Sequence, residues 1–161
     1  MSIAENVIIE DSPSFEISDY VFRCAESLGI GRLGGYIKVS FADDIGIFSG
    51  EADGTEDRVD VRLRTNDVDD TQLKVHIAHE LIHAVQILTG RLLHIGLTWC
   101  EQRHSIVYKH IFDGVEYINV GYADQPWEEE AYRYEEEVYQ TIESGGKECS
   151  EVQSAIYPYR S

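Results

Sequence analysis

Two histidines and a glutamate in this chain stand at a metal-binding spacing. His79 and His83 are four residues apart, and Glu80 follows the first of them in the stretch HELIH. On a helix, residues four apart lie on the same face, so both imidazoles reach one cation while Glu80 points about 100° round the axis. Zinc lowers the pKa of its bound water to about 7, and a neighbouring carboxylate then takes the proton and later gives it to a leaving amine. The spacing therefore predicts hydrolysis of a peptide or another amide bond, with Glu80 as the base.

The sequence around this motif predicts a buried helix. Residues 69–71 offer an N-cap, the stretch through Thr89 is apolar round most of its circumference, and Gly90 closes it. Polar side chains in the middle of such a helix are costly unless they are hydrogen-bonded or bind a metal. The alternative to a zinc site is that His79 and His83 are ordinary core residues whose ring nitrogens form hydrogen bonds within the protein.

A catalytic zinc site needs a third protein ligand and leaves its fourth position to water. The candidates are four other histidines and the acidic residues of a helix expected over residues 126–142: His76, His94, His104, His110, Glu128, Glu129, Glu130 and Glu135 to Glu137. On that helix Glu128 lies about 60° from the centre of the apolar stripe, whereas Glu130 lies about 100° and Glu129 about 160° away. Glu128 is thus the better inward-pointing ligand. Glu135 is also near the stripe and is a candidate acceptor for a zinc-bound imidazole.

The segments at residues 79–86 (HELIHAVQ) and 126–132 (PWEEEAY) resemble the small gluzincin-type metallopeptidase domains of bacterial and phage genomes. The resemblance covers the layout of about residues 35–140. It implies one zinc ion per chain, held by His79, His83 and Glu128. It also implies that the strand before the central helix, residues 58–64 or its neighbour, binds an extended peptide. Such enzymes use a histidine or tyrosine to stabilise the oxyanion, and four residues are candidates between which the sequence does not choose: Tyr122, Tyr132, His104 and His110.

The remaining patterns predict the elements that position this site. Apolar residues at helical spacing indicate a first helix over residues 14–28, and alternation indicates strands at 36–41 and 58–64. We interpret the acidic segment between those strands as a solvated hairpin connection, because it lacks the spacing of a calcium loop. Extended pieces are expected at 97–107 and 114–120. Residues 1–161 are expected to form a single α+β, zincin-like domain, with a small, mostly antiparallel sheet packed on the central helix.

Composition limits the partners that we expect. Because the chain carries a net charge of −17, we do not expect it to bind nucleic acid or an anionic membrane directly. The same charge suggests an alternative function, a non-catalytic acidic module with a structural zinc ion that mimics DNA or inhibits a basic protein. No apolar run reaches the ~18 residues of a membrane span, no signal-peptide pattern stands at the start, and three scattered cysteines form no framework. We therefore expect a cytoplasmic hydrolase acting on a peptide or protein, with no oligomeric state indicated.

Overall fold

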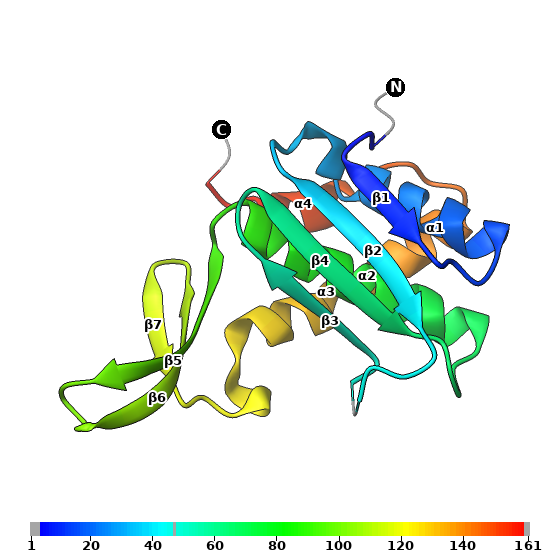
Figure 1. Cartoon of the computed structure of the whole chain (residues 1–161). Helices are drawn as coiled ribbons and strands as arrows, with labels where there is room; N and C mark the ends of the chain where they lie inside the picture. Colours follow the sequence, from blue (N-terminus) through cyan, green and yellow to red (C-terminus); the bar gives the residue numbers. More distant parts are fainter. Residues whose placement is uncertain (1–3, 47, 160–161) are drawn as a thin grey trace.

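A computed structural model describes residues 4–46 and 48–159 of the chain, in which helices pack on one of two small sheets (Figure 1). The α+β class expected from the sequence is confirmed. The helices of this described part are α1 (Phe15–Ser27), α2 (Asp70–Leu88), α3 (Pro126–Glu143) and α4 (Ser150–Ile156). The strands are β1 (Val7–Glu10), β2 (Tyr36–Ala42), β3 (Gly50–Gly54), β4 (Arg58–Arg64), β5 (Leu92–Cys100), β6 (Ser105–Phe112) and β7 (Val115–Ile118), with short 3-10 turns at Ile30–Arg32 and Tyr122–Asp124.

The larger sheet has the strand order β1-β2-β4-β3. β1 pairs with β2, and β2 with β4, in parallel, while β3 runs antiparallel to β4. The expectation of a mostly antiparallel sheet is therefore wrong for the sheet that packs on the central helix. The reason lies in the acidic segment after β2, which contains a strand of its own. Because β3 forms a hairpin with β4 and reverses the chain, β4 runs in the same direction as β2.

The central helix α2 matches its sequence prediction closely. The Asp69 side chain accepts a hydrogen bond from the Gln72 amide, and the Gln72 side chain accepts one from the Asp69 amide, which together form a capping box. Every residue from 77 to 88 is buried. The helix ends at Leu88, and Gly90 follows with a φ of +75° that a glycine adopts without strain.

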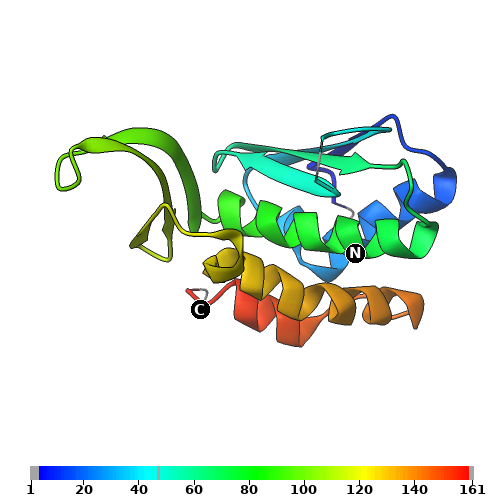
Figure 2. The same ribbon diagram turned by 90° about the horizontal axis from the view of Figure 1, so that it is seen from below.

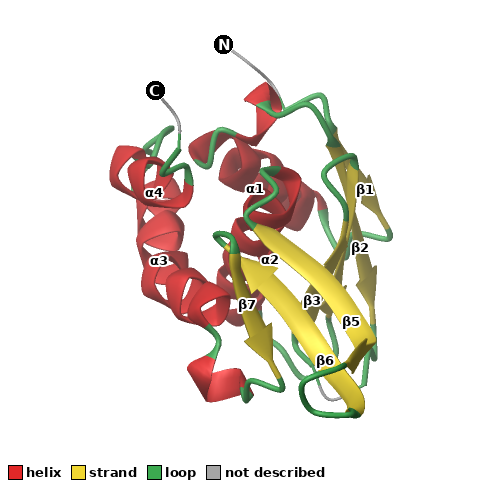
Figure 3. Ribbon diagram, turned by 90° about the vertical axis from the view of Figure 1, so that its left-hand side faces the viewer, coloured by secondary structure: helices red, strands yellow, loops and turns green. Residues whose placement is uncertain are grey.

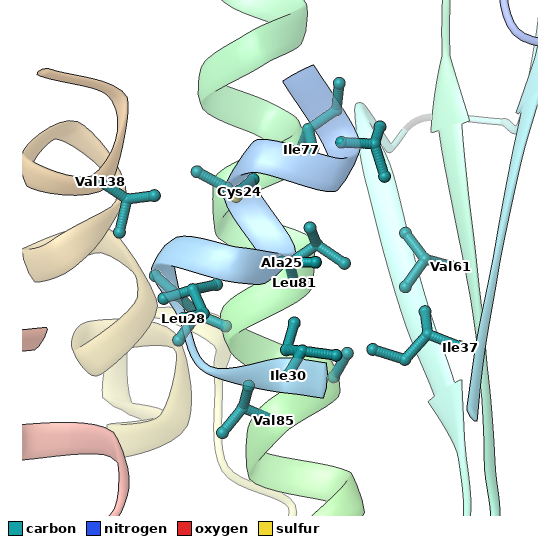
Figure 4. Packing of buried hydrophobic residues seen from close by; sticks show 14 of the residues in the cluster. Cys24, Ala25, Leu28, Ile30, Ile37, Val61, Ile77, Leu81, Val85 and Val138 are labelled. Atoms are coloured by element: carbon teal, nitrogen blue, oxygen red, sulfur yellow. The ribbon is translucent and has the colours of Figure 1, made fainter. Parts of the chain in front are cut away.

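α2 lies in the middle of three layers. The sheet lies on one side, α1 lies beside α2 in the middle layer, and α3 and α4 lie on the other side (Figure 2). Buried apolar side chains join these layers. Figure 4 labels such side chains from α1 and the turn that follows it, from the sheet, from α2 and from α3, among them Leu28, Ile37, Val61, Ile77, Leu81, Val85 and Val138. This packing holds α2 and α3 side by side, which fixes the separation of side chains projecting between them.

The second sheet, β5-β6-β7, is antiparallel throughout and projects beyond the end of α2 (Figures 1 and 3). The extended piece expected over 97–107 is in fact the tip of the β5-β6 hairpin, because residues 101–104 form the turn. Within the described residues, no helix combines the length and the apolar character that crossing a bilayer requires.

Candidate metal centre

The structure brings two histidines of α2 and a glutamate of α3 to one point. His79 and His83 are on consecutive turns of α2, and Glu128 is in the first turn of α3. Nε2 of His79 lies 3.0 Å from Glu128 Oε1, and Nε2 of His83 lies 2.7 Å from Glu128 Oε2. All three residues are buried, and their ligand atoms lie within 4.8 Å of one another. The grouping predicted from the helical faces is therefore confirmed, and it could hold a metal ion.

The spacing of these atoms fits a tetrahedral ion. Ligand atoms at the 2.0–2.1 Å typical of zinc stand about 3.3 Å from one another around such an ion. The two imidazole Nε2 atoms are 3.1 Å apart, and the nitrogen to carboxylate distances are 2.7 to 3.0 Å. A shift of a few tenths of an ångström in each side chain therefore accommodates the ion, and two nitrogens with one oxygen are a donor set suited to a first-row transition metal.

Each imidazole is oriented by an acceptor on its other nitrogen. His79 Nδ1 lies 2.7 Å from Glu135 Oε2, and His83 Nδ1 lies 2.8 Å from Gln86 Oε1. With the proton on Nδ1, the Nε2 lone pair of each ring would be free to bind a metal at the shared point. Glu135 is the acceptor expected from the sequence, whereas Gln86 was not expected, although its position three residues after His83 on the same helix face was a usable signal.

A buried ionic network extends from Gln86 towards the hairpin. Gln86 Nε2 donates to the Trp127 carbonyl at 3.1 Å and to Glu130 at 2.6 Å. Glu130 in turn accepts from the buried Arg91, which also binds both carboxylate oxygens of Asp113 at 2.8 and 3.0 Å. The network ties α2, α3 and the β6-β7 turn together, so the orientation of His83 is linked to the position of the second sheet.

Burial and charge compete at the candidate ligands. Burial lowers the pKa of His79, but hydrogen bonds with Glu128 and Glu135 outweigh it and raise that pKa to about 10. Burial alone would raise the pKa of Glu128, yet its hydrogen bonds with His79 and His83 hold it well below its ordinary value. Glu128 is therefore a carboxylate at neutral pH, as a metal ligand must be.

Glu80 lies in the same cleft and packs against strand β3. It is only 6% exposed, and burial raises the pKa of its carboxyl group. A Cβ atom added at Gly50 would stand 2.8 Å from Glu80 Cγ and 3.0 Å from Oε1. The absence of a side chain at Gly50 thus leaves the room that the Glu80 carboxylate occupies. Sequence reasoning missed Gly50, because nothing in the local pattern links residue 50 to residue 80.

The other candidate residues occupy distinct places. His76 lines the cleft, and its Nδ1 atom is buried without a hydrogen-bond partner among the described residues. His94 and His110 lie together on the hairpin with ring centroids 4.9 Å apart, and His104 is exposed at the β5-β6 turn. Among the described residues, the group that could hold a metal ion contains none of these histidines, and its third member is Glu128.

Two of the four candidate oxyanion donors lie at the metal centre. Tyr122 donates a hydrogen bond to Glu128 Oε1 at 3.0 Å, and its hydroxyl lies 2.7 Å from that of Tyr132. The Tyr132 ring packs on His79 with a centroid distance of 4.6 Å. Burial, followed by these hydrogen bonds, raises the pKa of Tyr122, so the hydroxyl keeps its proton.

The site opens into a cleft of about 1050 Å³. Residues 49–53 on and beside β3 form one wall, and His94, Tyr108 and His110 of the hairpin form another. β3 is the edge strand of its sheet, whereas β4 lies between β2 and β3. The resemblance offered residues 58–64 or their neighbour as the strand that binds a peptide. The neighbour, β3, is the strand that lines the cleft.

Comparisons of the chain with protein-family models, with curated proteins and with solved structures gave no match.

Proposed function

We propose that the protein is a zinc-dependent hydrolase with a zincin-like fold, that it is a metallopeptidase, and that it works in the cytoplasm. The observation that carries this proposal is the buried group of His79, His83 and Glu128 beside a second buried carboxylate, Glu80, in one open cleft. Two imidazoles, one carboxylate and one open position are typical of catalytic rather than structural zinc sites. Three free, buried cysteines are in keeping with a reducing compartment.

Bound zinc would supply a Lewis acid that polarises the scissile carbonyl and makes water acidic near pH 7. Glu80 then accepts the proton of the attacking water as the new carbon to oxygen bond forms. The protonated Glu80 passes that proton to the amide nitrogen as the carbon to nitrogen bond breaks, which leaves a free carboxyl and a free amine. Burial of Glu80 supports this shuttle, because a raised carboxyl pKa brings its proton affinity closer to that of water activated near neutral pH.

The walls of the cleft suit an extended polypeptide. The open edge of β3 offers unpaired main-chain donors and acceptors to a strand laid beside it. The hydroxyls of Tyr122 and Tyr132 lie beside Glu128 and offer O–H donors to a developing oxyanion. Peptide hydrolysis is therefore better supported than hydrolysis of a small amide, which would need no strand edge.

The test is the substitution Glu80→Gln, which keeps the size of the side chain and removes its basicity. We expect the variant to bind zinc as the native protein does and to lose activity by roughly 10²–10⁴-fold. The assay is cleavage of fluorescently labelled, denatured casein, with product masses to locate the cut bonds. Glu129→Gln, which makes the same change on the exposed face of α3, is the control and should keep full activity. Full activity in a folded, zinc-loaded Glu80→Gln protein would refute the mechanism.

A further inference from the structure

The projecting hairpin carries an exposed apolar surface. In the β5-β6 register, Leu97 lies opposite Tyr108 and Trp99 lies opposite Ile106, so the four side chains project from the same face of the sheet. They are 74%, 48%, 51% and 60% exposed, respectively. We call these four residues the hairpin face. Contiguous apolar surface of this kind on a monomer marks a place where another molecule binds.

The hairpin face is continuous with the wall of the cleft. Along β6, every second side chain projects from the same face of the strand, and this face carries Ile106, Tyr108 and His110. Tyr108 and His110 both line the cleft. His94 lies opposite His110 in register and also lines it. One sheet surface therefore runs from the cleft outward to the tip of the hairpin formed by β5 and β6, whose strands Figure 3 shows side by side.

The length of this surface favours a polymer as its occupant. The five residues from Ile106 to His110 span four steps along the strand, or roughly 13 Å, which an extended peptide also covers in about four residue steps. A small amide held at the metal centre would not reach the hairpin face. A second copy of the chain is disfavoured by mutual repulsion, since each copy carries a net charge of −17. The same charge disfavours an anionic membrane.

We propose that the hairpin face binds bulky apolar side chains of an extended or unfolded polypeptide substrate, about two to four residues away from the bond that is cleaved. This inference rests on the proposed function and adds the substrate class to it. The side chains close to the cleaved bond should be neutral or basic, because Glu51, Asp53 and Glu135 line the cleft. The enzyme then selects disordered, apolar segments over folded surfaces, whose apolar residues are buried.

The test compares two peptides that share one bond mapped in denatured casein. The long peptide continues for about eight residues on both sides of the bond, and the short peptide stops about two residues from it, too near to reach Trp99 and Ile106 at the outer end of the hairpin face. The variant is Trp99→Thr with Ile106→Thr, because threonine keeps strand propensity. The control is Leu93→Thr, on the opposite face of the same sheet and 37% exposed.

We expect the double variant to lower kcat/KM for the long peptide by roughly tenfold, mainly through KM, and to leave the short peptide unchanged. The control should stay within about twofold of the native protein on both peptides. An unchanged kcat/KM for the long peptide would overturn the inference. An equal loss of kcat/KM on both peptides would also overturn it, because that loss would show damage to the cleft itself.

Binding separates this inference from the proposed function. Labelled denatured casein is titrated with the zinc-loaded Glu80→Gln protein, with and without the hairpin substitutions, and fluorescence anisotropy gives Kd whether or not any bond is cut. A roughly tenfold weaker Kd supports the hairpin face even if cleavage fails. An unchanged Kd overturns it even if cleavage succeeds. A native dimer that the double variant converts to a monomer with undiminished casein binding would assign the face to a second copy of the chain and also overturn it.

Discussion

Gly50→Ala tests how tightly the fold positions the Glu80 carboxylate. The new Cβ atom would stand 2.8 Å from Glu80 Cγ, whereas ordinary van der Waals contact begins at about 3.4 Å. Because Gly50 does not have the positive φ that disfavours alanine, the backbone accepts the change and Glu80 must move by about 0.6 Å. A misplacement of 1 Å costs about 100-fold in rate, so we expect kcat to fall roughly tenfold.

The assay pairs casein cleavage with zinc titration of the same Gly50→Ala preparation. Zinc affinity should stay within about twofold of the native value, because the added methyl group meets Glu80 and Leu63 and none of the metal ligands. Gly34→Ala is the control, since a Cβ atom at Gly34 has no neighbour within 4 Å among the described residues. Native kcat in Gly50→Ala would refute this reasoning about Glu80, and a parallel loss of zinc would show that the base and the ligands move together.

Three further predictions concern the residues around the metal centre. Gln86→Leu and Glu135→Gln should each weaken zinc binding by about 10–100-fold in a chelator competition, and unchanged affinity would exclude them as orienting groups. Arg91→Met leaves two partly exposed acidic partners, Asp113 and Glu130, without their buried cation. It should lower the free energy of unfolding by about 2–3 kcal/mol in urea, less than for a fully buried pair, whereas a change below about 1 kcal/mol would show that the ion pairs are dispensable. Burial, followed by repulsion from a neighbouring histidine, lowers the pKa of His110 from 6.5 to about 4. As the pH falls through that interval the unfolded chain takes up the proton first, so the free energy of unfolding should fall by up to about 2 kcal/mol. His110→Gln should flatten the dependence of that free energy on pH, measured by urea unfolding at several pH values.

The centre of the fold was predictable because its signals are local. The cap at residues 69–71, the apolar run that follows and Gly90 define α2 almost to the residue. The spacing of His79 and His83, together with the apolar stripe of α3, placed both imidazoles and Glu128 at one point. In each case the helix period alone fixes the direction of the side chain.

The edges of the fold depended on contacts between distant segments. Strands β1 and β3 and helix α4 are short, and a short segment gives no usable period, so the parallel order of the larger sheet was missed. The fit of Glu80 against Gly50 joins residues that are thirty positions apart and depends on that strand order. The hairpin turn at residues 101–104 carries no glycine or proline, so its sequence does not distinguish it from the strands on either side.

The most direct test of the account is the metal content of the purified protein, measured by mass spectrometry after zinc is supplied and excess is removed. We expect one zinc ion per chain in the native protein and in His104→Ala, whose imidazole lies at the exposed hairpin turn. His79→Ala and Glu128→Ala, checked for folding by circular dichroism, should lose the ion. A native protein that takes up no zinc, or a Glu128→Ala variant that holds it as tightly as the native protein does, would contradict the metal centre described above.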